Sequence, residues 1–277
     1  ELSGGMRKRV GLARAIVMEP DIAAFKALLE QDDNIAAVIL EPTGGHWGQF
    51  PLPNPGFLEE LRDITATHGV VMIMDEVICG FRTSPGGAQD KFNIRPDLTT
   101  MAKILAGGLP GAAVAGRADI MELIGSKDPS RFLAHTGTFN ANPVSATAGI
   151  ATLELIANEP INERADAMAA RLKQGLNDAL TRMEVAGHAH GLASVVNIAL
   201  GVDCDCYREI CTLPHSDLAK AAAPRAMKIK LAMLNEGVDT FGGIGFMVSA
   251  VHEAQQIDQT LEAFERALVA LRDEGVV

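Results

Sequence analysis

The length and composition of the chain indicate a globular protein with one large or two modest domains. It has 277 residues, of which 48% are hydrophobic and 21% are charged, so a sizeable core can form and an intrinsically disordered chain is excluded. Its 35 acidic and 24 basic residues give a formal net charge of -11. This balance argues against a nucleic-acid partner, because affinity for nucleic acids rests on the neutralisation of phosphates.

The apolar runs are too short for a membrane partner. The runs at 35–40 and 70–74 fall far short of the roughly 20 residues that cross a bilayer, and no charged-then-apolar leader opens the chain. Four cysteines are too few for a disulfide scaffold in a chain of this length. We therefore expect a cytoplasmic protein. The first residue is Glu1 rather than Met, so we expect the chain to be a piece of a longer one.

Residues 35 to 115 alternate short apolar runs with helical spacing, a pattern typical of a mostly parallel α/β sheet. The pattern predicts four buried strands, at 35–40, 70–74, 98–102 and 112–115. Between the first two strands, a helix beginning at Phe57 is expected to end at Gly69. At the start of the chain, Ser3 is expected to cap a basic amphipathic helix that runs to about Met18.

The pattern of apolar residues changes in the second part of the chain. Helical spacing covers 142–157 and 161–183, and the change near 158–160 predicts a bridge between domains. Beyond it, strands are expected at 194–200 and 245–249, with a closing amphipathic helix at 257–271. The predicted organisation is a helical segment at 1–20, part of a large α/β domain at 21–158 and a smaller α+β domain at 159–277.

Polar residues that end apolar strands are the first site candidates, because ligands of open α/β sheets bind at the carboxyl ends of strands. Glu41, Asp75 and Lys103 have this position. Alone, the pair Asp75-Glu76 is more typical of a helix cap or a surface acid than of a functional site. Lys103 lies among apolar residues, so we expect a buried amine, whose lowered pKa makes it a nucleophile. Together, the amine and the acid match what a pyridoxal phosphate enzyme requires: a lysine to bind the cofactor aldehyde and an acid to keep the pyridine nitrogen protonated.

Several motifs in register carry a family resemblance. From about Asp21 onward the chain resembles the class III aminotransferases, and within them it is similar to the glutamate-1-semialdehyde 2,1-aminomutase branch. The matching sequences are AAVILEP at 36–42, GFLEELR at 56–62, MDEVICGFR at 74–82, GAQ at 87–89, PDL at 96–98, Lys103 with its glycines, GT at 137–138 and NP at 142–143.

The resemblance implies a partial large domain of the fold type I pyridoxal-phosphate-dependent transferases, followed by the smaller C-terminal domain. It implies pyridoxal 5'-phosphate as cofactor, with Lys103 bound to its aldehyde, Asp75 paired with its ring nitrogen and Val77 packed on the ring face. It also implies a small amino acid or amino-aldehyde as substrate. Gly137 and Thr138 correspond to a segment that reaches the cofactor phosphate of the neighbouring subunit, which implies a homodimer.

The sequence departs from the family pattern at two places. His46 stands where the aminomutases usually have an asparagine near the cofactor; it could bond the ring hydroxyl or be a partly exposed loop residue. Roughly the first two fifths of a family chain, with the turn that cradles the cofactor phosphate, has no counterpart. We therefore expect an exposed sheet edge at 35–40 or a neighbouring strand, poor solubility or oligomerisation, weak cofactor binding and little or no turnover.

In place of the absent part, residues 2–15 resemble the signature motif of ABC transporter ATPases. The sequence holds no Gly-x-x-x-x-Gly-Lys-Ser/Thr loop, so ATP hydrolysis is not expected. Three hypotheses follow, in this order: a transaminase or aminomutase impaired by truncation, a non-catalytic oligomerising remnant of such an enzyme, and an ABC-type nucleotide-binding fragment.

A metal site is not expected. Cys204, Cys206, Cys211 and His215 lie close together in sequence, but a Cys-x-Cys start is unusual for zinc, and scattered loop thiols are the favoured interpretation. His188 and His190 are predicted to flank a turn that leads into a strand.

Overall fold

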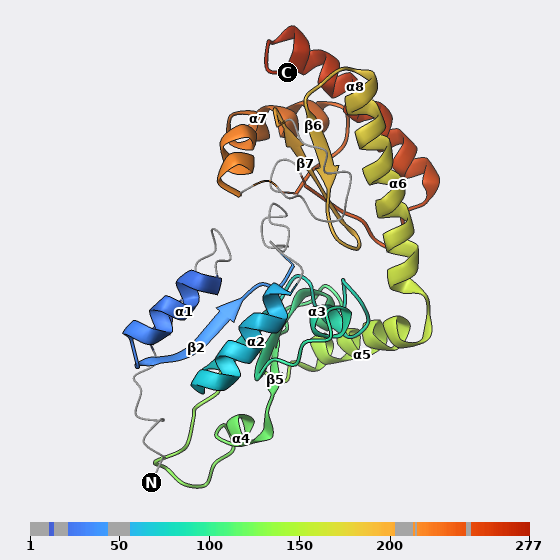
Figure 1. Cartoon of the computed structure of the whole chain (residues 1–277). Coiled ribbons are helices and arrows are strands. Elements are labelled where there is room, and N and C mark those ends of the chain that lie inside the picture. The colour runs from blue at the N-terminus through green and yellow to red at the C-terminus, as the bar shows by residue number, and fades with distance from the viewer. Residues whose placement is uncertain (1–10, 14–21, 44–55, 203–212, 214, 242–244) are drawn as a thin grey trace. The chain divides into compact units, whose positions relative to one another are not determined.

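The computed structural model describes residues 11–13, 22–43, 56–202, 213, 215–241 and 245–277. The chain divides into two compact units. The first comprises residues 1–42 and 54–159, and the second comprises residues 43–53 and 160–277. Each unit has its own β-sheet (Figure 1).

The first unit contains a mostly parallel sheet, as predicted. Within the described residues it has five strands in the order β1-β2-β3-β4-β5. They are β1 (Gly11–Ala13), β2 (Ile35–Leu40), β3 (Val71–Glu76), β4 (Leu98–Met101) and β5 (Ala113–Gly116). The first four strands pair in parallel, and β5 runs antiparallel to β4. Val38, Met72 and Met74 are almost fully buried, which explains why these strands read as continuous apolar runs.

Helices of 4 to 16 residues accompany this sheet. They are α1 (Ile22–Gln31), α2 (Phe57–His68), α3 (Gly87–Lys91), the 3-10 helix η2 (Lys103–Ala106), α4 (Ala118–Met121) and α5 (Pro143–Asn158). Helix α2 buries Leu58, Leu61 and Ile64, which recur at helical spacing. It ends at Gly69, whose φ of 65° suits a residue without a Cβ.

Strand β1 bears on two predictions about the start of the chain. Residues Gly11–Ala13 were expected to be helical, and they instead pair in parallel with Ile35, Ala37 and Val38 of β2. Long-range strand pairing outweighs the local helical preference of this segment. The sheet edge expected at 35–40 or a neighbouring strand lies, within the described residues, at the neighbour β1, which pairs with part of β2.

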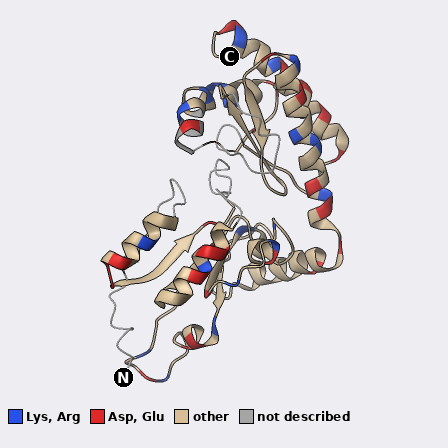
Figure 2. Ribbon diagram, in the orientation of Figure 1, with Lys and Arg blue, Asp and Glu red and all other residues tan. Residues whose placement is uncertain are grey.

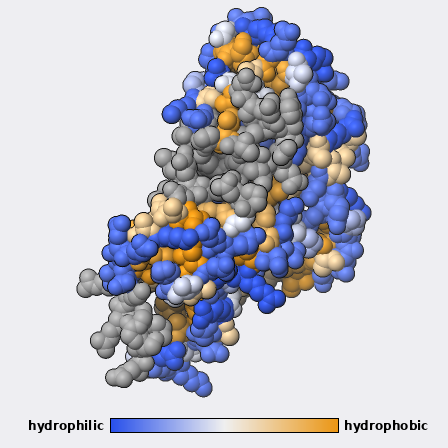
Figure 3. Space-filling view, in the orientation of Figure 1, coloured by the Kyte–Doolittle hydropathy of each residue, from blue (hydrophilic) through white to orange (hydrophobic). Residues whose placement is uncertain are grey.

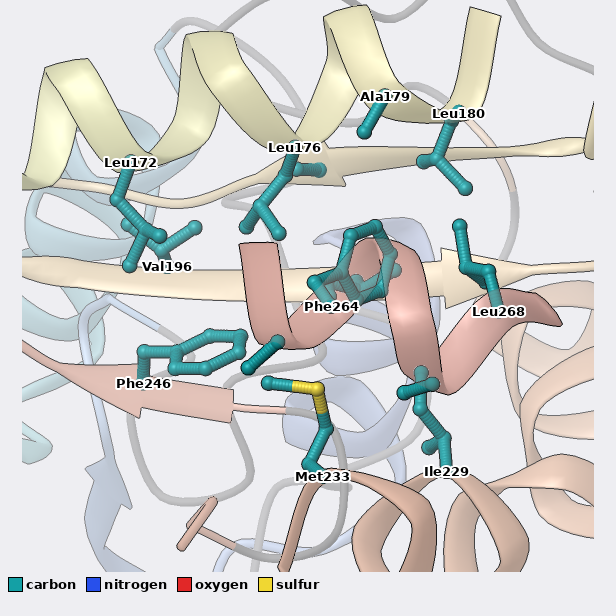
Figure 4. Packing of buried hydrophobic residues seen from close by; sticks show 14 of the residues in the cluster. Leu172, Leu176, Ala179, Leu180, Val196, Ile229, Met233, Phe246, Phe264 and Leu268 are labelled. Atoms are coloured by element: carbon teal, nitrogen blue, oxygen red, sulfur yellow. The ribbon is translucent and has the colours of Figure 1, made fainter. Parts of the chain in front are cut away.

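The second unit is an α+β arrangement around an antiparallel sheet. In the described part of the unit, the sheet has the order β6-β7-β8. Its elements are α6 (Ile161–Arg182), β6 (Gly187–His190), β7 (Val195–Leu200), α7 (His215–Asn235), β8 (Gly245–Met247) and α8 (Ala254–Asp273). Leu176 from α6 and Phe264 and Leu268 from α8 point into one apolar cluster with Val196 of β7 (Figure 4). Charged residues gather along α6 and α8 (Figure 2), where Arg171 donates to Asp258 at 2.7 Å.

Strand β6 is a further correction. The segment with His188 and His190 was expected to be a turn, and it pairs with β7 from Gly187 to His190. Both imidazoles are buried, with ring centroids 5.2 Å apart. Burial lowers the pKa of His188.

Candidate functional site

Asp75 lies at the carboxyl end of β3, where its side chain is held by two donors. Its Oδ1 accepts hydrogen bonds from the Thr100 hydroxyl at 3.2 Å and from the Val77 N–H at 3.1 Å. Thr100 is the in-register partner of Asp75 on β4. The carboxylate is half-buried, so it stays accessible to a ligand while its orientation is fixed.

The neighbouring Glu76 anchors the segment that follows the strand. Its buried carboxylate accepts from the N–H groups of Ala88 at 2.8 Å and Gln89 at 3.1 Å, and from the Gln89 side chain at 3.2 Å. Burial raises the pKa of Glu76, and these hydrogen bonds offset that effect only in part. Since side chains alternate along a strand, Glu76 faces away from Asp75. Its hydrogen bonds to Ala88 and Gln89 hold the segment that begins with Val77.

Lys103 lies two residues beyond the end of β4, as the first residue of η2. Strands β3 and β4 are parallel neighbours, so the acid and the amine belong to the same edge of the sheet. The expectation of a buried amine is wrong: Lys103, the first residue of the 3-10 helix that follows β4, is exposed. Its φ is +50°, a left-handed conformation that costs about 1 kcal/mol for a residue with a Cβ.

Gly137 and Thr138 lie on a separate segment, in an exposed stretch that precedes α5. The Gly137 carbonyl accepts from the Asn140 N–H at 3.0 Å. The next residues start α5, where the Asn142 side chain caps the helix. The structure therefore brings Asp75, Val77 and Lys103 to one sheet edge and places the glycine-threonine pair elsewhere in the first unit.

Several predicted residues lie outside the described residues, namely His46, Cys204, Cys206 and Cys211, and the side chain of His215 is not described either. Among the described residues, His, Cys, Asp and Glu side chains form no group of three or more suited to a metal ion. No helix in this part of the chain is both long and apolar enough to cross a membrane.

Sequence reasoning missed Thr100, which orients Asp75. The available signal was the Thr99-Thr100 pair inside a strand, because a hydroxyl in a buried strand needs a polar partner. In the structure, Thr100 finds Asp75 and Thr99 lies 3.4 Å from the Gln89 side-chain nitrogen.

Comparisons with known proteins converge on one family. The family model "Aminotransferase class-III" matches residues 14–268. A glutamate-1-semialdehyde 2,1-aminomutase of Brevibacillus brevis is 36% identical over 253 residues, which are 90% of this chain and 56% of that protein. An omega-transaminase structure from Sphaerobacter thermophilus has a TM-score of 0.78 at 31% identity, over 91% of this chain and 56% of that one.

A transaminase solved with pyridoxal phosphate bound has a TM-score of 0.77 at 26% identity, and the match covers 94% of this chain and 57% of that one. The chain thus spans about half the length of the relatives that it matches. The predicted fold class, a partial fold type I transferase, and the predicted family resemblance are confirmed.

Proposed function

We propose that this chain, which belongs to the class III aminotransferase family, binds pyridoxal phosphate through Lys103 and Asp75 and serves amino-group transfer on a small amino acid or amino-aldehyde. The observation that carries the proposal is the placement of both residues at the carboxyl ends of adjacent parallel strands. Transamination between two substrates and transfer between neighbouring carbons of one substrate both use this pair.

The donor set fits the cofactor. When bound, pyridoxal phosphate supplies an aldehyde that condenses with an amine and a ring that accepts an electron pair. The Asp75 carboxylate, oriented by Thr100 and Val77, would accept the N–H of the ring nitrogen and keep its proton in place. The Lys103 amine would hold the aldehyde carbon and, once displaced by substrate, move a proton to and from the substrate carbon.

The remaining contacts would come from residues around this pair. Val77 is half-buried two residues after Asp75, in position to pack on one face of the ring. Gly137 and Thr138 would reach the phosphate of a neighbouring subunit's cofactor, and His46 would bond the ring hydroxyl.

Exposed apolar side chains support a homodimer. Phe139 and Val144, beside the glycine-threonine pair, are 60% and 65% exposed, and Ile150 and Leu155 continue the apolar surface along α5. Figure 3 shows apolar surface in the region of α5. A surface of this kind is more typical of an interface than of a monomer.

Reduction with borohydride in the presence of pyridoxal phosphate tests the proposal. We expect one covalent adduct, located at Lys103 by peptide mapping and absent in Lys103→Ala. Lys127→Ala, which removes another exposed lysine, should leave the adduct unchanged. Asp75→Asn should weaken cofactor binding by roughly 10- to 100-fold, the worth of one charge-assisted hydrogen bond. A chain that oligomerises but gives no adduct at Lys103 would instead support the non-catalytic remnant.

A further inference from the structure

We propose that Gly149 is a positioning residue for Lys103, because its missing side chain lets α5 lie directly against the turn η2 that begins with the lysine. The inference rests on the proposed role of Lys103 as the cofactor-binding amine. It adds a residue, 46 positions further along the chain, that determines where this amine stands.

The contact at Gly149 is between backbones. A Cβ at this position would lie 2.6 Å from the carbonyl oxygen of Leu105 and 3.6 Å from the Cα of Ala106. Ordinary contact begins near 3.4 Å, so any side chain here would force the helix and the turn apart by roughly 0.8 Å. Leu105 is only two residues from Lys103, and a backbone carbonyl cannot rotate away as a side-chain tip can.

The residue that follows η2, Gly107, also lies very close to α5. A Cβ at Gly107 would lie 2.7 Å from both the Ala148 carbonyl oxygen and the Thr152 hydroxyl. Beyond it, the Ser145 hydroxyl donates to the Pro110 carbonyl at 2.7 Å. Ser145, Gly149 and Thr152 recur at helical spacing, so they share one face of α5. Ser145 and Gly149 are buried, and this face of α5 contacts the segment 105–110 at three places.

Lys103 needs such support. Its φ of +50° is unfavourable for a residue with a Cβ, and a local conformation of this kind persists only where the surroundings hold it. Inside the turn, the Leu105 N–H donates to the Ala102 carbonyl at 3.0 Å, across Lys103. Packing of α5 on Leu105 and Ala106 fixes this hydrogen bond and, through it, the backbone of the lysine.

The test substitutes Gly149→Ala in the full chain. The matched control is Gly175→Ala in α6, another glycine within a helix, whose added methyl would meet the end of the Leu261 side chain rather than backbone. Both substitutions raise helix propensity by a similar amount, so an effect of propensity alone would appear in both.

Two readouts follow the position of the amine. The first is the pyridoxal phosphate concentration at which half of the protein molecules carry the borohydride-trapped adduct on Lys103, measured at several pH values. Misplacement by a fraction of an ångström should raise that concentration about 10-fold in Gly149→Ala and leave Gly175→Ala unchanged. The second needs no cofactor: the rate of trace acetylation of Lys103 against pH, relative to Lys127, should change in Gly149→Ala only.

The outcomes separate this inference from the proposed function. If wild-type protein gives no adduct at Lys103, the proposed function is contradicted. The acetylation profile by itself then tests whether Gly149 positions the lysine. An adduct in wild-type protein that forms equally well in Gly149→Ala, with an unchanged acetylation profile, overturns the inference. Should Gly149→Ala fail to fold, Ser145→Ala removes the hydrogen bond to Pro110 without adding bulk and should shift both readouts in the same direction. Unchanged readouts in that variant overturn the inference as well.

Discussion

Asp97 is a buried carboxylate that joins three elements of the first unit. It accepts from the Met72 N–H at 2.8 Å, from Arg62 at 2.9 Å and from Arg117 at 2.9 Å. Burial raises the pKa of Asp97, but the hydrogen bonds from Met72 and the two arginines outweigh it and hold the pKa below its ordinary value. A carboxyl with a lowered pKa stabilises the folded state above its unfolded pKa.

Asp97→Asn should therefore lower the free energy of unfolding at neutral pH by about 1–3 kcal/mol, since it leaves two guanidinium groups with a weaker acceptor. The deficit relative to wild type should shrink as the pH falls through the lowered pKa, because protonation of Asp97 removes the same charge. Urea unfolding between neutral and acidic pH measures both effects. Asp119→Asn, which removes the other, exposed partner of Arg117, should cost much less. A deficit that grew toward acidic pH would contradict the sign of this linkage.

Some residues of the candidate site could be predicted from the sequence, and others could not. Asp75 was predictable because it follows an apolar run, which places it at the carboxyl end of a strand. The exposure of Lys103 was not, because apolar neighbours such as Ile104 and Leu105 indicate burial in a strand, whereas here they form a turn. Contacts such as that of Thr100 with Asp75 depend on strand register, which a single sequence does not specify.

At the scale of elements, the start of α5 depends on one side chain. The Asn142 Oδ1 accepts from the N–H groups of Val144 at 3.0 Å and Ser145 at 3.1 Å, and Pro143 occupies the first helical turn. These donors have no partner within the helix, so the cap stabilises them.

Asn142→Ala should reduce stability by about 1 kcal/mol and fray the first turn of α5. Asn142→Asp keeps the acceptor and should retain most of the stability. Thermal unfolding measures the loss, and hydrogen exchange at Val144 and Ser145 locates it. Equal protection of these two amides in wild type and Asn142→Ala would show that the cap contributes nothing.

Elements with strong local patterns were predictable, and elements defined by pairing were not. The run Ile35–Leu40 is a strand with the predicted bounds, and the helix from Phe57 ends at Gly69 as expected. Strand β6 was missed because a short segment with two histidines has no alternating apolar pattern. Strand β1 was missed because its three residues become a strand only through pairing with β2, whose residues lie 24 or 25 positions further along the chain.

At the scale of the whole molecule, each unit has its own sheet and its own buried residues. Val38, Met72 and Met74 lie in the first unit, while Leu176, Phe264 and Leu268 lie in the cluster of the second. A buried cluster confined to one unit should stabilise that unit, because stability follows local packing.

Leu176→Ala removes a fully buried side chain from the second cluster and should cost about 2–5 kcal/mol there. Hydrogen exchange should accelerate in β6, β7 and β8, whereas the amides of β2, β3 and β4 should keep their protection, because their packing is unchanged. Val269→Ala, on the exposed face of α8, is the matched control and should alter neither set by more than about 0.5 kcal/mol. If Leu176→Ala accelerated hydrogen exchange equally in the strands of both units, the two units would unfold as one cooperative body rather than separately.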